Sequence, residues 1–323
     1  MRHPIRITGL SLLVLLLVLL PWIADKYSLQ LIIYVMTYSM LALGFSLCWK
    51  ARLIRVDLAG YWAIGAYATG MLMTKAGWSY WPTIAAGGFI AAIIAWGVGS
   101  LTIPRGGLVF FSFAMLVSLV IQQTVAASNF FGGWAGIESM PPPAIGSFVF
   151  RGKTEYYFLG LFLLSINFVT YYLLYDSRIG RAWTAIGSGV GFAKSLGVNV
   201  VRYRLFAVII SSFFCAVSGS YLASYQMYII PDSFGFYQSI MIQMFSLVGG
   251  LNSFLAGPLV GAAIMTFIPE YLKVTAEIEP ILTAVVIILV ILFMPLGILG
   301  LVRRWWRSSI VIRMRSKLTI RST

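Results

Sequence analysis

Long apolar blocks separated by short polar stretches dominate the chain. Blocks of this kind are typical of membrane-spanning helices, whereas the strands of a membrane β-barrel show alternating hydrophobicity. Ten blocks can be delimited, and they predict an all-α polytopic membrane protein with eight to ten transmembrane or half-spanning helices. The blocks cover residues 7–24, 28–49, 58–75, 81–102, 107–127, 156–175, 204–226, 235–250, 255–270 and 280–300.

Glycine and proline interrupt three of these blocks. Glycines recur in block 58–75, a glycine pair ends block 235–250, and Gly257-Pro258 stands near the start of block 255–270. A broken helix in a membrane needs protein or water around it, because lipid cannot satisfy free backbone groups. If each half of the chain has five spans, the halves have opposite orientations. The breaks then fit an inverted repeat with a transport path between the halves.

Composition excludes several other classes of protein. The chain of 323 residues is 60% hydrophobic and 10% charged, whereas soluble domains are about 25% charged. A soluble globule, a disordered chain and a disulfide scaffold are therefore excluded. Cys48 and Cys215 lie in apolar blocks and are expected to be small buried side chains. Since the single histidine is His3, no metal site can be built, and no cofactor is expected.

The charges predict the orientation of the chain. The net charge is +14. With the N-terminus in the cytoplasm, 18 of the 23 basic residues lie on the cytoplasmic side and seven of the nine acidic residues lie outside. This split follows the positive-inside rule and predicts that both termini are cytoplasmic. The chain then comprises one membrane domain (1–302), with a cytoplasmic loop at 176–203, and a basic cytoplasmic tail (303–323).

The sequence carries no motif for catalysis. Residues 187–195 are similar to a phosphate-binding P-loop, but Ser188 and Ala193 stand where that motif requires glycine. One histidine near the terminus is incompatible with most hydrolytic designs. We therefore expect that the chain is not an enzyme and that any ATP hydrolysis takes place on a separate subunit.

Ionisable residues are expected to be essentially absent from the interior of the spans. Two other classes stay open on this basis. An ion- or proton-coupled secondary transporter needs a buried ionisable relay, and a channel needs a ring of like groups. The polar groups expected at or near depth are the amides Gln122, Gln123, Asn167, Gln238 and Gln243. A path without fixed charge suits a zwitterionic or neutral apolar substrate.

The loop 176–203 has the composition of a short amphipathic segment. Its start is charged, Gly180 is expected at a helix boundary, and a short helix is expected over 182–196. Gly197 and Asn199 are typical of a turn that ends a helix. A helix with a small-residue face suits docking into a groove of another protein, although an ordinary interfacial helix has a similar composition.

This loop and stretches before and after it form a recognisable pattern: Ala63–Tyr67, Pro104–Gly106, Phe113–Met115, Gly132–Ile137, Ile179–Ile186, Gly197–Leu205, Gly219–Ala223, Pro231–Ile240, Gly249–Gly261 and Leu292–Leu301. In these stretches the chain resembles the permeases of branched-chain amino acid ABC importers. The resemblance covers nearly the whole chain from about residue 30. The length and the terminal pattern resemble the larger of the two permease subunits that these systems pair.

The resemblance implies a permease subunit of an ATP-driven importer in a bacterial-type inner membrane. It implies a second permease subunit, two cytoplasmic ATP-binding subunits and a periplasmic or lipid-anchored substrate-binding protein as partners. Branched-chain amino acids are the implied substrates, and related permeases carry urea, amides and other small solutes. The residues expected to dock the ATPase are Arg181, Ala182, Ala185, Ile186, Ser188, Lys194 and Gly197.

Two departures from the family pattern stand out. Ser188 and Val190 replace acidic residues that the family usually carries in its coupling helix, and Asp57-Leu58 replaces a pair of small polar residues. The first departure bears on which ATPase binds the chain, and the second bears on which substrate the chain carries. The residues expected along the translocation path are Gly65, Gln122, Gln123, Gln238, Gln243, Gly249 and Gly250.

Overall fold

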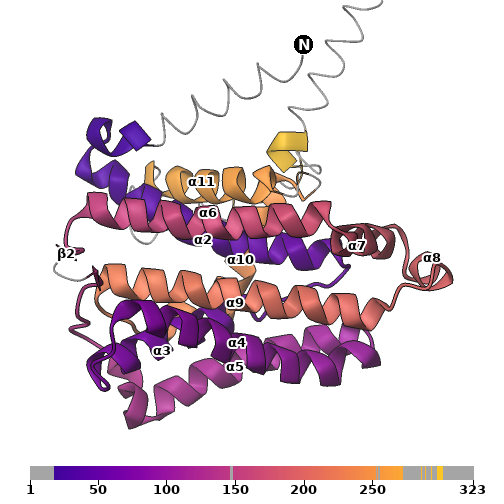
Figure 1. Cartoon of the computed structure of the whole chain (residues 1–323), viewed down its shortest axis with the longest axis horizontal. Coiled ribbons are helices and arrows are strands. Elements are labelled where there is room, and N and C mark those ends of the chain that lie inside the picture. Colours follow the sequence, from indigo (N-terminus) through magenta and orange to yellow (C-terminus); the bar gives the residue numbers. More distant parts are fainter. Residues whose placement is uncertain are drawn as a thin grey trace, which may run out of the picture.

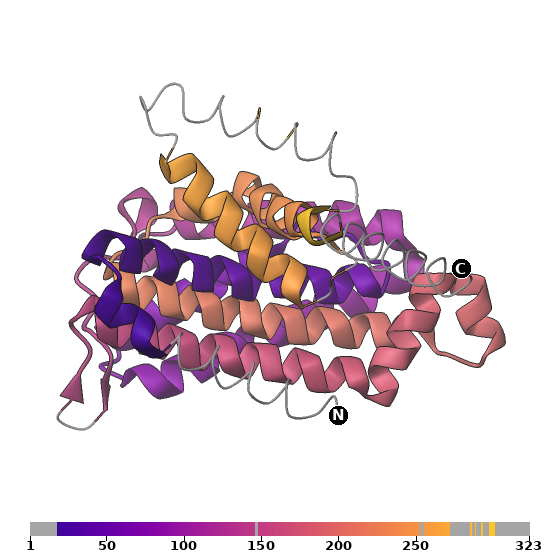
Figure 2. The same cartoon turned by 90° about the horizontal axis from the view of Figure 1, so that it is seen from above.

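The protein is described here from a computed structural model, which describes residues 18–145, 148–251, 253, 255–271, 285, 288, 292 and 297–300. It is an elongated bundle of helices, with α7 and α8 projecting at one end (Figures 1 and 2). The helices are α2 (Lys26–Lys50), α3 (Leu58–Thr74), α4 (Tyr80–Thr102), α5 (Gly107–Ala127), α6 (Lys153–Asp176), α7 (Arg178–Ser188), α8 (Val190–Ser195), α9 (Val200–Gln226), α10 (Phe236–Gly249) and α11 (Ala256–Tyr271). The short elements are the 3-10 turns η1 (Ile103–Arg105), η2 (Asn129–Phe131), η3 (Gly133–Ala135) and η4 (Pro231–Phe234) and the strands β1 (Ala144–Ile145) and β2 (Phe148–Val149).

Five helices in the described part of the chain are long and apolar enough to cross a membrane. They are α2, α4 with η1, α5, α6 and α9. Helices α3, α10 and α11 are shorter, with 17, 14 and 16 residues. These helices coincide within a few residues with eight of the ten predicted blocks and agree with an all-α polytopic membrane protein. Blocks 7–24 and 280–300 lie largely outside the described residues, so the number of spans stays a prediction.

Helix α9 forms the centre of the bundle and packs against α2, α3 and α4 (Figures 1 and 2). It runs antiparallel to α2. Near one end of this contact the Cys48 sulfur lies 3.2 Å from the Ser211 hydroxyl, and further along Ser218 donates to the Thr37 carbonyl at 3.0 Å. These small polar side chains let the two helices approach closely and give the hydroxyls a partner where lipid offers none.

Several glycines mark places where helix backbones touch. A Cβ atom at Gly65 of α3 would lie 1.9 Å from the Ala216 carbonyl oxygen of α9. A Cβ atom at Gly249 of α10 would lie 1.7 Å from the Gly257 oxygen of α11. Any side chain would push these helices apart, because such contacts are much shorter than van der Waals distance. Gly65 and Gly249 therefore serve helix packing, and their place along the translocation path stays a prediction.

The loop between α5 and α6 contains several short elements of regular structure. It contains η2, η3 and the two-residue hairpin of β1 and β2. Ile137 forms an isolated antiparallel bridge with Ile229, which lies just before η4. Gly136 has φ +80°, and a Cβ atom there would lie 1.8 Å from the Ile229 oxygen. The loop is thus fastened over the segment that leads into α10.

The predicted short helix 182–196 is in fact two helices, and the predicted boundary at Gly180 is wrong. Helix α7 begins at Arg178, where the Ser177 hydroxyl caps it by accepting from the Ile179 amide at 3.1 Å. Gly180 lies inside α7, and a Cβ atom there would lie 1.9 Å from the Tyr175 oxygen. A glycine is required at this point because α7 turns sharply against the end of α6. The predicted turn at Gly197 is confirmed, with φ +76°.

Candidate functional site

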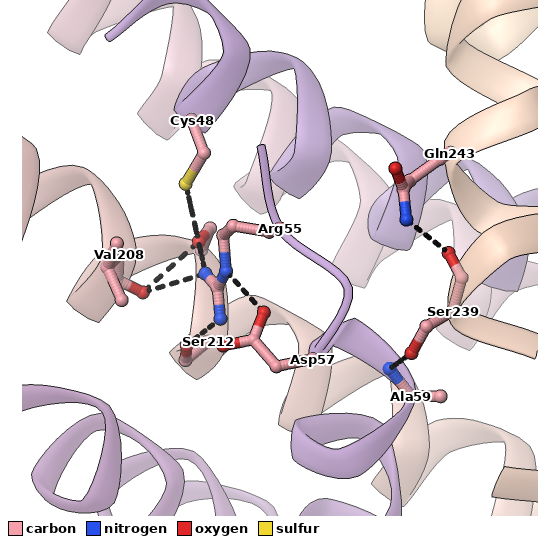
Figure 3. Close-up of polar contacts among 9 residues, drawn as sticks. Cys48, Arg55, Asp57, Ala59, Val208, Ser212, Ser239 and Gln243 are labelled. Carbon is pink, nitrogen blue, oxygen red and sulfur yellow. Dashed lines mark hydrogen bonds and ion pairs between the residues drawn. The ribbon is translucent and has the colours of Figure 1, made fainter. Parts of the chain in front are cut away.

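Two broken helices begin beside each other inside the bundle. After α2 the chain turns back into the interior over residues 51–57 before α3 starts, and after α9 it returns over residues 228–235 before α10 starts. The Ala59 amide of α3 donates to the Ser239 hydroxyl of α10 at 3.0 Å, and both residues are buried (Figure 3). The first turn of a helix has free N–H groups and a partial positive charge. Two such ends lie together here.

A buried ion pair stands next to these helix ends. The Arg55 Nε lies 2.7 Å from the Asp57 Oδ1, and both side chains are about 0–1% exposed. The guanidinium also donates to the Ser212 hydroxyl at 2.8 Å and the Val208 carbonyl at 3.2 Å, and it contacts Ser211 (Figure 3). These partners lie near the middle of α9. Arg55 is therefore fixed to the central helix by charge-assisted hydrogen bonds, which are stronger than neutral ones.

This ion pair corrects the expectation that charge is essentially absent at depth. Arg55 follows α2 by only five residues, and the chain carries it back into the bundle. The second carboxylate oxygen of Asp57 is buried without a hydrogen-bond partner among the described residues. A sequence signal was present: in an extended segment, side chains at i and i+2 point to the same side. The spacing of Arg55 and Asp57 therefore allows a local pair that compensates both charges.

Aromatic side chains enclose the starts of the two broken helices. Trp62 of α3 lies 4.8 Å from Phe234 in a T-shaped arrangement, measured between ring centroids, and 6.2 Å from Tyr38. Tyr38 in turn lies 5.1 Å from Phe245 of α10. The Tyr61 ring lies 5.1 Å from the guanidinium carbon of Arg55. Such contacts fix α2, α3 and α10 relative to one another and exclude solvent from the ion pair.

A cavity of about 470 Å³ lies between α2, α10 and α11. Tyr34, Tyr38, Gln238 and Glu270 are among the residues that line it. Gln238 is thus one predicted path residue that faces a cavity. Tyr27 donates to Glu270 at its edge. The cavity has aromatic walls and a few polar groups, a combination typical of binding sites for small molecules.

The other predicted path residues are scattered. Gln243 is 9% exposed and donates to the Ser239 carbonyl at 3.2 Å, whereas Gln123 is exposed. Gln122 is half-buried beside the start of α10, since a Cβ atom at Gly235 would lie 3.2 Å from its side-chain nitrogen. Gly250 forms the turn after α10 with φ +107°. The structure therefore places Gln122 beside the start of α10, Gln238 in its first turn and Gln243 near its middle, whereas Gln123 is exposed.

The predicted docking residues divide into two groups. Ala182 and Ile186 are 7% and 0% exposed and pack inward with Trp183, so they anchor α7 and cannot face another protein. The apolar side of α7 is buried against the chain itself, so docking through α7 stays a prediction that rests on its outer side. The remaining positions lie on the outer side, with Ala185 half-buried and the others exposed: Arg181, Ser188, Lys194 and Gly197.

A second cavity, of about 710 Å³, lies beside the contact between α7 and the end of α2. Lys50 and Arg52 line one side, and Thr184 and Ser188 line the other. The Lys50 ammonium lies 3.3 Å from the centroid of the Tyr175 ring, a cation–π contact that joins α2 to α6. The end of the bundle that carries α7 is thus open and basic.

A polytopic helical bundle in which two broken helices begin together in the interior is typical of membrane transport proteins. The sequence model of the family described as the branched-chain amino acid transport system permease component matches residues 27–295. The chain belongs to this family of permease components. The resemblance predicted from the sequence motifs is confirmed.

Curated relatives include both types of subunit from one kind of transport system. The high-affinity branched-chain amino acid transport system permease protein LivM of Salmonella typhimurium is 23% identical, and the match covers 91% of this chain and 75% of the relative. LivH of Escherichia coli is 25% identical, with 82% and 91% covered. The ribose import permease protein RbsC of Haemophilus influenzae is 28% identical, with 41% and 43% covered. No solved structure matches the chain significantly.

Proposed function

We propose that the chain is a permease subunit of an ATP-driven importer for branched-chain amino acids or related small organic solutes. The observation that carries this proposal is the family match over residues 27–295, together with the LivM match over 91% of the chain. The chain forms one half of the translocation path. A second permease subunit forms the other half, two cytoplasmic ATPases drive transport, and a periplasmic or lipid-anchored protein delivers the substrate at a bacterial-type inner membrane.

An inverted repeat accounts for the packing of the helices. Helix α2 packs against α9, α10 and α11, and α9 packs against α2, α3 and α4. Exchanging α2 with α9, α3 with α10 and α4 with α11 converts one set of contacts into the other. Both long helices are also followed by a left-handed residue, Arg52 (φ 51°) and Met227 (φ 58°). In this arrangement the path follows the interface between the halves, where α3 and α10 begin.

The outer surface of α7 and α8 is the proposed ATPase-docking surface. Its exposed cations are Arg178, Arg181 and Lys194, and residues 177–203 contain no aspartate or glutamate. The positive-inside rule puts this loop in the cytoplasm. Because the surface carries only positive charge, the complementary groove of the ATPase should be acidic.

Reconstitution tests this proposal. The chain is co-purified with its partner permease and ATPase and placed in liposomes, and the binding protein is added with radiolabelled leucine. We expect uptake that requires ATP and is abolished by a hydrolysis-deficient ATPase. Uptake that persists without the ATPase and follows a proton or sodium gradient would instead establish a secondary transporter. ATP-dependent uptake of urea or an amide, but not leucine, would keep the permease assignment and change the substrate.

A further inference from the structure

Residues 51–57, here called the α2–α3 segment, are fastened to α7 at one end. The Arg52 Nε donates to the carbonyl of Gly187, in the last turn of α7, at 2.8 Å. Arg204 of α9 holds the same end through the Ala51 carbonyl at 3.0 Å and the Arg52 carbonyl at 3.2 Å. Two arginine side chains thus donate to three backbone carbonyls, one in α7 and two in the α2–α3 segment. Because each donor is charged, these hydrogen bonds are stronger than neutral ones.

The other end of the segment is fastened to the candidate site. Arg55 binds Asp57 and the middle of α9, and two residues after Asp57 the Ala59 amide binds Ser239 of α10 (Figure 3). All these groups are buried. Two sets of polar contacts, joined by the backbone of the α2–α3 segment, therefore link the last turn of α7 to the starts of both broken helices.

A cavity borders the contact between α7 and the α2–α3 segment. The cavity of about 710 Å³ lies between the last turn of α7 and the residues Arg52 and Ile54 of the α2–α3 segment. The end of α7 also lies close to the end of α2, since a Cβ atom at Gly187 would lie 3.1 Å from the Lys50 carbonyl oxygen. A shift of the last turn of α7 therefore reaches the α2–α3 segment through this contact and through the Arg52 hydrogen bond. The segment itself is short, with only seven residues, which span at most roughly 25 Å when fully extended.

We propose that the α2–α3 segment transmits movement of α7 to the starts of α3 and α10, with Arg52 as the positioning residue. This inference rests on the proposed function, in which α7 docks the ATPase. When the ATPase shifts α7, the Arg52 tether pulls one end of the segment. Because Arg55 and Asp57 bind the other end to α9 and stand directly before α3, these groups move together with the segment, and the displacement reaches the Ala59–Ser239 contact, where the two helix ends meet. Transport is then coupled to hydrolysis through this contact series.

The test compares Arg52→Ala with Arg105→Ala in the reconstituted complex. Arg105 is also exposed, and it donates to the Leu101 carbonyl of its own helix, so the control removes an equal charge and a similar bond. For Arg52→Ala we expect retained ATP hydrolysis and about a tenfold fall in leucine taken up per ATP, which corresponds to about 1.4 kcal/mol. The control should keep the wild-type ratio, and Arg52→Lys should recover part of it.

Two outcomes would overturn the inference. One is an unchanged ratio of uptake to hydrolysis in Arg52→Ala while the wild-type complex transports. The other is equal loss of hydrolysis and uptake, which would make Arg52 a purely structural or docking residue. If the wild-type complex itself shows no ATP-dependent uptake of any solute tested, the proposed function fails first, and the two failures are thereby distinguished.

A second measurement does not depend on any variant folding correctly. Hydrogen–deuterium exchange is compared between the nucleotide-free wild-type complex and the complex trapped with ADP and vanadate. The peptide covering residues 51–61 should change its exchange rate by about threefold or more, because its hydrogen bonds are strained or released, while the middle of α4 stays constant. An unchanged rate over residues 51–61, with a change elsewhere that proves trapping, would refute transmission through this segment.

Discussion

The Arg55–Asp57 ion pair allows a quantitative test of how the site is held together. Both side chains are buried, and the Nε–Oδ1 distance is 2.7 Å. Removing one partner leaves an uncompensated buried charge, which typically costs about 3–5 kcal/mol. We therefore expect Arg55→Met and Asp57→Leu each to destabilise the protein by roughly that amount. Replacing a whole buried pair by apolar side chains is often nearly neutral.

The double variant Arg55→Met/Asp57→Leu is therefore expected to be far more stable than either single variant. In the double variant the Val208 carbonyl still has a hydrogen-bond donor, because Ser211 also donates to it at 3.1 Å. The Ser212 hydroxyl loses its contact with the guanidinium, which costs about 1 kcal/mol. The expected coupling energy between the two substitutions is thus at least about 3 kcal/mol.

Thermal and SDS-induced unfolding of the four proteins in detergent measures this coupling as a double-mutant cycle. Uptake by the reconstituted complex is measured on the same samples. If the effects of the single substitutions simply add in the double variant, the ion pair contributes nothing as a pair and the reasoning is refuted. A stable double variant with wild-type uptake would limit the pair to folding, whereas a stable double variant without uptake would assign it to transport.

Three further predictions concern packing, the helix ends and docking. Gly65→Ala should destabilise the bundle by about 1–3 kcal/mol in the same unfolding assay, because its Cβ atom would collide with α9. Gly97→Ala is the control and should be neutral or stabilising, because a Cβ atom there meets nothing within 4 Å. Ser239→Ala should cost about 1–3 kcal/mol because the buried Ala59 amide loses its acceptor, and an unchanged melting temperature would contradict this role. Ala185→Arg, on the half-buried outer side of α7, should leave membrane insertion intact and uncouple ATP hydrolysis from uptake, so normal leucine transport would exclude this surface as the docking site.

The relation between sequence and structure differs between the helices and the site. Hydrophobic blocks located α2, α4, α5, α6 and α9 within a few residues, because a helix in lipid must satisfy its own backbone and needs about 20 apolar residues to cross. The turn at Gly197 was also predictable, since few residues other than glycine adopt φ +76°. These requirements are local, so a single stretch of sequence is enough to predict the helix or the turn.

The roles of three glycines could not be predicted from the residues next to them in the sequence. Gly65 and Gly249 were expected along the path, and Gly180 at a helix boundary, because glycine is typical of both places. The structure shows all three at close backbone contacts with Ala216, Gly257 and Tyr175. Glycine has the same identity whether it serves a turn, a path or a contact, so only the neighbour that approaches it decides its role.

By itself the sequence determined that the helices lie in a lipid bilayer, the class of fold and the family, because apolar blocks and motifs are properties of consecutive residues. Only the tertiary structure decided that Arg55 and Asp57 lie inside the bundle, that α3 and α10 begin at the same place, and that Ile186 faces inward. The physical reason is that a buried charge is tolerated only when its partners are present. Most of the partners of Arg55 are on α9, about 150 residues further along the chain.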